Sequence, residues 1–173
     1  MTSIRTERLL LRPARPEDAE AMFEVLSDPE AMRFWSTPPH ESVERTRAWI
    51  DRMIVSHACG WHGDFLVEHD GLVVGNAGFS RASEVGFIIR RDCWGQGFGR
   101  EAASATIAYG FETLDLPAVT ADVDPRNLAS LGLLESLGFA RTGFAERTFN
   151  VGGQWVDSLY LTLERPDLHP PGC

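Results

Sequence analysis

Cysteine is scarce in the 173-residue sequence, and histidine is not clustered. The three cysteines, Cys59, Cys93 and Cys173, are odd in number and far apart, so they predict neither a disulfide framework nor a zinc knuckle. The five histidines show no spacing typical of metal ligands. We therefore expect no metal site.

Long apolar runs are also missing. None approaches the ~20 residues that a membrane-spanning helix requires. The first residues, Met1 to Arg5, lack the apolar stretch of a signal peptide. Together with the scarcity of cysteine, these absences predict a cytoplasmic protein with no membrane partner.

Basic residues are outnumbered by acidic ones, 16 against 25, which gives a formal net charge of −9. A nucleic-acid partner is not expected, because binding phosphates requires a basic face. The acidic balance is compatible with a cationic substrate such as an amine, and equally with a role in solubility alone.

What is present is typical of one globular domain. Hydrophobic residues make up 43% of the chain, with ten Phe and five Trp available for a core. A chain of this length favours a single domain over residues 1–173, with a loose tail at 166–173.

The hydrophobic pattern predicts about seven strands and four helices in the order β α α β β β α β α β β. The predicted strands lie at 9–11, 65–67, 72–74, 85–89, 118–123, 141–149 and 155–163. The predicted helices begin near 15–18, 43, 97 and 124, and end near 27–29, 57, 114 and 138. The hairpins require antiparallel pairing, whereas the unit at 85–123 requires a parallel crossover, so we expect an α/β (α+β) fold with a mixed, mostly antiparallel sheet and helices on both faces.

A glycine-rich turn joins the strand at 85–89 to the following helix. Its residues are Trp94, Gly95, Gln96, Gly97, Phe98, Gly99 and Arg100. Glycines let backbone N–H groups approach a ligand, and a helix N-terminus favours an anion. The turn lacks the Gly-Lys-Ser/Thr end of a Walker loop and the G-x-G-x-x-G spacing of a Rossmann loop. A pyrophosphate suits it, although a glycine turn alone is a weak signal.

Four segments together resemble the GNAT (GCN5-related N-acetyltransferase) superfamily, and most closely its ribosomal-protein N-terminal acetyltransferase subfamily. They lie in the expected order along almost the whole chain: residues 6–12, 84–89, 94–102 and 124–139. This resemblance implies a single GNAT domain whose fourth and fifth strands splay apart. It also implies an enzyme that moves the acetyl group of acetyl-CoA to a primary amine.

The resemblance implies a role for each matching residue. Pantetheine would pair with the main chain of Phe87, Ile88 and Ile89, and an N–H near Ile88 would stabilise the oxyanion. The pyrophosphate would bind Gly95, Gln96, Gly97, Phe98, Gly99 and Arg100. Asn127 and Ser130 would reach the pantetheine arm or the sulfur, and Asn127 also suits a helix N-cap.

Catalysis would be direct attack by a neutral amine held beside the thioester. The resemblance points to Glu84 as a general base, with a solvated strand-end carboxylate as the alternative, and Asp122 is a weaker candidate. Many relatives carry a Tyr seven residues after the Asn to protonate the thiolate, and here Leu134 occupies that position. Ser130 is the nearest substitute.

The acceptor pocket is expected from the first two helices, their connection and the last two strands. Trp35 and Trp61 are candidate substrate-binding residues, while Phe34 is expected in the core. The acceptor is a protein N-terminal α-amine or, alternatively, a small-molecule amine such as an antibiotic or a polyamine. A non-catalytic acyl-CoA-binding module is the alternative of another class. The last strands suggest a homodimer, because relatives often dimerise there.

Overall fold

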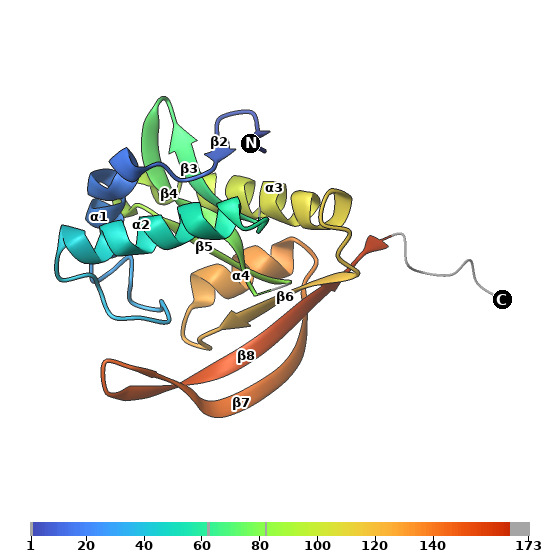
Figure 1. The fold of residues 1–173 in the computed structure, drawn as a ribbon. Helices are drawn as coiled ribbons and strands as arrows, with labels where there is room; N and C mark the ends of the chain where they lie inside the picture. Colours follow the sequence, from blue (N-terminus) through green and yellow to red (C-terminus); the bar gives the residue numbers. More distant parts are fainter. Residues whose placement is uncertain (1, 62, 82, 167–173) are drawn as a thin grey trace.

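The computed structural model describes residues 2–61, 63–81 and 83–166, with only the backbone described for Arg81. Eight strands form one sheet in these residues, in the order β1-β2-β3-β4-β5-β6-β8-β7 (Figure 1). The strands are β1 (Ile4–Arg5), β2 (Leu10–Arg12), β3 (Asp64–His69), β4 (Leu72–Arg81), β5 (Glu84–Ile89), β6 (Ala118–Val123), β7 (Ala140–Val151) and β8 (Gln154–Glu164). The helices are α1 (Ala19–Leu26), α2 (Val43–Ala58), α3 (Phe98–Glu112) and α4 (Leu128–Ser136).

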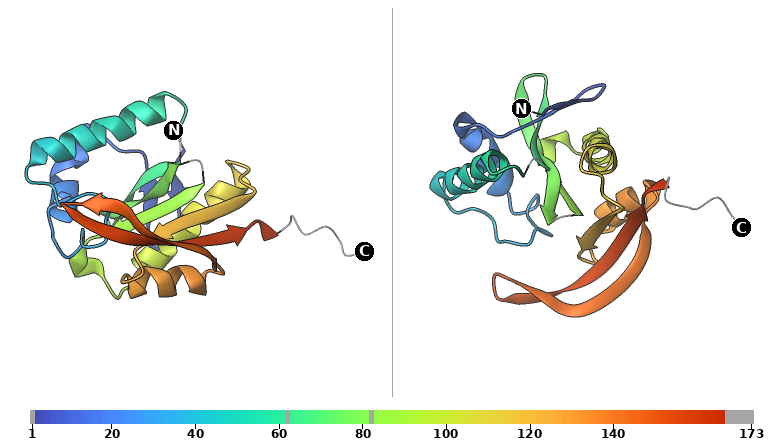
Figure 2. Two further views of the ribbon diagram at one scale, coloured as in Figure 1. Left: turned by 90° about the horizontal axis from the view of Figure 1, so that it is seen from below. Right: turned by 45° about the vertical axis from the view of Figure 1, so that its right-hand side comes forward.

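The helices cover the sheet in two layers, with α1 and α2 on one face and α3 and α4 on the other (Figure 2). The alternation of side chains along β3 fits this arrangement. Phe65 and Val67 belong to the core under α3, whereas Leu66 belongs to the core under α1 and α2. The predicted mixed sheet with helices on both faces is confirmed.

Strand pairing is antiparallel throughout the sheet except between β5 and β6, which are parallel. Helix α3 makes the crossover between these two strands, as the pattern at 85–123 predicts. The pairing therefore changes from antiparallel to parallel between the two strands that the glycine turn and α3 connect.

Two details of the strands differ from the sequence prediction. The short strand β1 is an addition to the seven that the pattern predicts, and β4 continues to Arg81 rather than ending near residue 74. Gly75 and Gly78 hide the strand pattern in β4. A Cβ on Gly75 would lie 2.1 Å from the Ile88 carbonyl oxygen, so the close approach of β5 requires glycine there.

A buried ion cluster joins β2 to the start of α1. The Arg12 guanidinium donates to both carboxylate oxygens of Asp18 at 2.8 and 2.9 Å and to Glu68 at 2.7 Å. The hydrogen bond with Asp18, followed by that with Glu68, outweighs burial and raises the pKa of Arg12 above its ordinary value. This cluster fixes where α1 begins and so positions the connection from α1 to α2.

The β7–β8 hairpin extends as a long curved ribbon beneath the rest of the molecule (Figure 1). Register shifts between Arg141 and Gly143 and between Ala145 and Phe149 accompany the curve. Phe144, Trp155 and Tyr160 are exposed on the hairpin. Dimerisation there stays a prediction. The predicted tail at 166–173 lies outside the described residues except for Pro166.

Candidate functional site

The sheet is interrupted between β5 and β6. In the described residues these strands pair only at Glu84↔Thr120, where the Thr120 N–H also donates to the Ser83 carbonyl at 2.8 Å. Beyond this pair the strands diverge, and a cleft of about 250 Å³ opens beside them. The expected splay between the fourth and fifth predicted strands lies at this point.

The backbone of β5 faces the gap at alternate residues. The Arg90 N–H donates to the Val74 carbonyl at 2.8 Å, so Arg90 is turned toward β4. Because antiparallel strands alternate, Ile88 is also turned toward β4, while Phe87 and Ile89 direct their N–H and C=O groups toward β6. The N–H groups near Ile88 that face the gap thus belong to Phe87 and Ile89. The side chains of Ile88 and Ile89 are buried in the core.

The glycine turn has the backbone conformation that an anion seat requires. Gly95 and Gly97 have φ of 74° and 83°, in the left-handed region that favours glycine. Gly97 is the N-cap of α3 and has no side chain with which to cap the helix. The first N–H groups of a 15-residue helix are therefore presented at the turn, with the Phe98 ring buried beneath them.

Two side chains of the turn contact neighbouring elements. The indole N–H of Trp94 donates to the Ile89 carbonyl at 2.7 Å, which folds the turn back onto the end of β5. Arg100 donates to the Ser136 hydroxyl and, at 3.4 Å, to the Ser136 carbonyl. Its guanidinium therefore binds the end of α4, a contact that the sequence did not predict.

Helix α4 brings polar groups to the cleft. The Asn127 Oδ1 atom accepts from the Ser130 N–H at 3.2 Å, so the predicted N-cap role of Asn127 is confirmed. Both residues line the cleft. Leu134, at the position where many relatives carry Tyr, also lines the cleft but is 1% exposed and belongs to the core. No acidic hydroxyl is available from that position.

Carboxylates line the cleft on β5, β6 and β8. Glu84 lies at its edge and accepts a hydrogen bond from the Ser80 hydroxyl at 2.8 Å. Asp122, Asp124 and Asp157 lie along the same cleft, with Arg33 and Arg126 as the only guanidinium groups among its lining residues in the described chain. Burial would raise the pKa of Asp124, but hydrogen bonds and the charge of Arg126 outweigh it and lower that pKa. The cleft therefore carries more negative than positive groups.

The structure separates the aromatic candidates. Trp35 lines the cleft, whereas Trp61 lines a neighbouring cavity with Trp49 and Asp64. Phe34, which the sequence analysis expects in the core, instead lines the cleft and is partly exposed. Its ring lies 5.2 and 6.0 Å from the guanidinium carbons of Arg33 and Arg126, and these cations explain why an apolar ring stays at the cleft.

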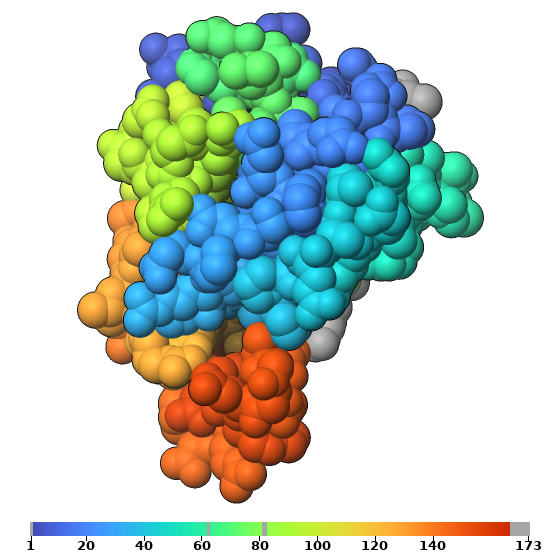
Figure 3. Space-filling view, turned by 90° about the vertical axis from the view of Figure 1, so that its left-hand side faces the viewer, coloured from blue at the N-terminus to red at the C-terminus, as the bar shows by residue number. Residues whose placement is uncertain are grey.

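The β7–β8 hairpin closes the outer side of the cleft. A Cβ on Gly152, at the hairpin tip, would lie 3.7 Å from the Pro38 ring. Figure 3 shows the orange tip directly beneath the blue connection from α1 to α2. The cleft is thus bounded by the hairpin and by this connection, as expected for an acceptor pocket.

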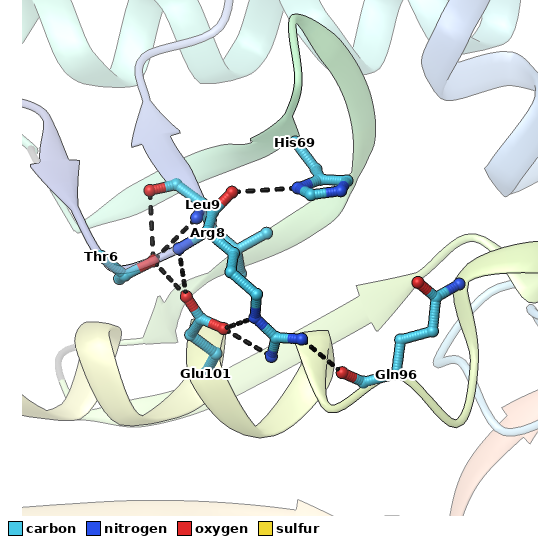
Figure 4. A network of polar contacts seen from close by, with 6 residues as sticks. All are labelled: Thr6, Arg8, Leu9, His69, Gln96 and Glu101. Carbon is cyan, nitrogen blue, oxygen red and sulfur yellow. Dashed lines mark hydrogen bonds and ion pairs between the residues drawn. The ribbon is translucent and has the colours of Figure 1, made fainter.

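Sequence reasoning missed a cluster at the N-terminus that contacts the glycine turn (Figure 4). The Arg8 guanidinium donates to the Gln96 carbonyl at 2.8 Å and forms an ion pair with Glu101 at 2.7 Å. Thr6 donates to Glu101 at 2.5 Å, and Arg8 lies 4.8 Å from the centroid of the Phe98 ring. Burial alone would raise the pKa of Glu101, but hydrogen bonds from Thr6 and Arg8 lower it.

This cluster sets the orientation of one peptide group. The C=O and N–H of a trans peptide point in opposite directions. Because Arg8 holds the Gln96 carbonyl, the Gly97 N–H of the same peptide points away from Arg8. Residues 6–12 are among the segments that carry the family resemblance, but nothing in that segment indicates a contact 88 residues away.

No group of three or more His, Cys, Asp or Glu side chains that could hold a metal ion occurs within residues 2–61, 63–81 and 83–166. No helix in the same ranges is long and apolar enough to cross a membrane.

Comparisons with known proteins agree with this geometry. The family model described as "Acetyltransferase (GNAT) domain" matches residues 8–140. The chain is 32% identical to the "Uncharacterized N-acetyltransferase p20" of Bacillus licheniformis, over 94% of this chain and 96% of the relative. It is 26% identical to two Escherichia coli (strain K12) proteins. One is a "Spermidine N(1)-acetyltransferase", aligned over 88% of this chain and 84% of the relative, and the other a "[Ribosomal protein uS5]-alanine N-acetyltransferase", aligned over 96% and 93%.

Solved structures share the fold. A GNAT-family acetyltransferase from Bacillus anthracis aligns with a TM-score of 0.82 at 27% identity, covering 94% of this chain and 98% of that chain. A RimL ribosomal L7/L12 α-N-protein acetyltransferase in complex with coenzyme A aligns with a TM-score of 0.83 at 18% identity, covering 94% and 98%, a likeness of fold. The sheet interruption, the uncapped glycine turn and these relatives lead to one conclusion: the chain belongs to the GNAT acetyltransferase family and is an N-acetyltransferase.

Proposed function

We propose that the cleft between β5 and β6 is the acetyl-transfer site and that the acceptor is the N-terminal α-amine of a peptide. The observation that carries the location is that, in the described residues, β5 and β6 pair only at Glu84↔Thr120. Where pairing stops, Glu84 and the open edge of β5 border the cleft, and the N-terminus of α3 follows the far end of the same strand. These are the parts that bind the arm of the donor, its pyrophosphate and the reacting amine.

The residues present fit acetyl-CoA, which supplies an activated acyl carbonyl on a thiolate leaving group. Gly95 to Arg100 would hold the pyrophosphate through the first N–H groups of α3. The pantetheine arm would pair with the main chain of Phe87 and the N–H of Ile89, which have no partner on β6 in the described residues, whereas the Ile89 carbonyl accepts from Trp94. Asn127 and Ser130 would flank its sulfur end from α4.

Transfer balances as a direct displacement. The lone pair of the neutral amine forms the new C–N bond, the C–S bond breaks, and the electron pair leaves with the thiolate. The nitrogen loses its proton to Glu84, directly or through a water molecule. A β5 N–H, from Phe87 or Ile89, would stabilise the oxyanion. Ser130 would hydrogen-bond the sulfur.

Charge and basicity support the choice of acceptor. The cleft carries four carboxylates against two guanidinium groups, which favours a cationic molecule on approach. A peptide α-amine has a pKa of about 8 against about 10.4 for an alkylamine, so a larger fraction is neutral at pH 7. A carboxylate is a weak base, so a site that uses Glu84 as its base is better suited to the less basic α-amine. A polyamine is the second candidate, favoured by the same excess of carboxylates.

Turnover on an amine panel tests this proposal. Purified protein is incubated with acetyl-CoA and peptides with free N-termini, the same peptides with blocked N-termini, spermidine, or an aminoglycoside, and free thiol is measured. We expect turnover with free N-termini and none with blocked ones. Turnover confined to spermidine or the aminoglycoside would contradict the choice of a peptide. Binding of acetyl-CoA without turnover on any amine would point to a non-catalytic module.

Replacing Glu84 with glutamine tests the base. We expect kcat/KM for the amine to fall about 100-fold, because general-base catalysis typically contributes ~10²–10⁴. The pH profile of the rate should also change, because the variant has no carboxylate to accept the proton of the amine. Affinity for acetyl-CoA should not change. Ser80→Ala is the matched control, because it removes the hydroxyl that donates to the Glu84 carboxylate and, at 3.5 Å, to the Glu84 carbonyl but keeps the carboxylate itself. An unaltered rate and pH profile in Glu84→Gln would exclude Glu84 as the base.

A further inference from the structure

A second cavity, of about 470 Å³, lies beside the cleft, between α2 and the strands β3 and β4. Ser80 lines both the cavity and the cleft, and its hydroxyl donates to Glu84. The cavity is therefore adjacent to the base. Its main groups are the rings of Trp49, Trp61 and Phe79 and the polar side chains of Arg52, Asp64 and Ser80.

Asp64 supplies a carboxylate that is poorly solvated. Its Oδ1 atom accepts from the Asn76 amide at 2.7 Å. Burial nevertheless raises the pKa of Asp64 to about 6, because hydrogen bonds from Asn76 and the Phe65 N–H offset only part of the desolvation. Among the described residues no cation pairs with Asp64. A desolvated carboxylate without a countercharge is costly, and an incoming cation relieves that cost.

The walls of the cavity suit the same kind of ligand. Trp49 and Trp61 are both partly exposed and both line the cavity. Indole faces attract ammonium groups, and the attraction grows when the cation loses water. The other charged group that lines the cavity is Arg52, an exposed residue of α2 that forms no ion pair with Asp64 in the described part of the chain.

We propose that this cavity is a second acceptor subsite, which binds an ammonium group of the substrate between Asp64 and the indoles while another amine of the same molecule reacts in the cleft. The inference rests on the proposed function of the cleft. It adds that good acceptors carry two cationic groups. Asp64 pairs with Gly78 in the β3–β4 ladder, and Ser80 lies two residues further along β4. Two residues of a strand span about 7 Å, so the two cationic groups of a good acceptor should be at least about that far apart.

Either of two acceptors supplies this chemistry. One is a small diamine, and the other is a peptide with a basic side chain next to its N-terminal residue. Hexamethylenediamine is compared with hexylamine, and alanyl-lysine amide with alanyl-glutamine amide. In the wild type we expect kcat/KM to favour the dicationic member of at least one pair by about 10-fold, through KM. The pair that shows the preference identifies the source.

Asp64→Asn tests the role of the carboxylate. The amide retains an oxygen for the Asn76 hydrogen bond but has no charge. We expect the preference for the dication to fall to less than about 2-fold, while kcat/KM for the monoamines is unchanged. Trp61→Leu should lose part of the same preference without touching the bond to Asn76. Asp51→Asn, exposed on α2, is the matched control and should behave as the wild type.

Direct binding separates this inference from the proposed function. Hexamethylenediamine is titrated calorimetrically into the wild type and into Asp64→Asn, with hexylamine as the reference ligand. If no amine is turned over, the proposed function fails, and weaker diamine binding to Asp64→Asn would still support the subsite. Equal preference and equal diamine binding in the two folded proteins would overturn the inference.

Discussion

Gly97→Glu is expected to weaken acetyl-CoA binding at least about 100-fold, which corresponds to ~2.7 kcal/mol. The substitution places a carboxylate at the N-cap of α3, where the pyrophosphate would bind, and like charges brought together in a binding site cost several kcal/mol. It also puts a side chain on a backbone with φ of 83°. Calorimetric titration with acetyl-CoA measures the loss.

Two further variants separate charge from strain. Gly97→Gln has the same bulk and the same strained backbone but no charge, so it should lose less affinity than Gly97→Glu. Gly71→Glu places the same residue on another positive-φ glycine, at the β3–β4 turn, where no atom lies within 4 Å of an added Cβ. It should bind acetyl-CoA as the wild type does. Unchanged affinity in Gly97→Glu would remove the pyrophosphate from this turn.

Arg8→Gln is expected to lower acetyl-CoA affinity about 10- to 100-fold although Arg8 lies outside the glycine turn. The guanidinium donates to the Gln96 carbonyl and thereby orients the Gly97 N–H. Losing a hydrogen bond from a charged group costs about 1.5–3 kcal/mol, which gives this range. We expect KM for acetyl-CoA to rise while kcat at saturation is preserved.

Acetyl-pantetheine distinguishes positioning from general damage. This donor has no phosphate, so its turnover by Arg8→Gln should match the wild type. The double variant Arg8→Gln/Glu101→Gln also removes the carboxylate that has lost its ion-pair partner, and it should regain thermal stability without regaining acetyl-CoA affinity. Arg5→Gln, exposed in the same segment, controls for the loss of one positive charge. Equal losses with both donors would show that Arg8 only maintains the fold.

Most helices and strands were predictable because their hydrophobic periodicity and the residues at their ends can be recognised over short stretches of sequence. The alternation in β6 and the helical spacing before Gly138 are readable from short windows of sequence. The extension of β4 was not, because Gly75 is required by the approach of β5, a contact with no local signature. Element type follows from local periodicity, whereas close contact between strands is a property of the assembled sheet.

The candidate site was predictable to a smaller extent. The glycine turn could be located because its positive φ angles favour glycine, and glycines are visible in the sequence. The positions of Phe34 and Trp61 could not be predicted, because the sequence does not distinguish an aromatic residue in the core from one in the cleft or in the second cavity. The contact from Arg8 to Gln96 spans 88 residues and also needed the fold.

The single pair at Glu84↔Thr120 also bears on how the molecule holds together. In mechanical terms the sheet is two plates, β1 to β5 and β6 to β8, which in the described residues are joined by strand pairing at this position alone. An acyl donor lying along Phe87 and Ile89 would take the place beside β5 where β6 forms no strand pairing in the described residues. Substrate binding and completion of the sheet would then be one event, so the loaded protein should resist separation of the plates more than the empty one.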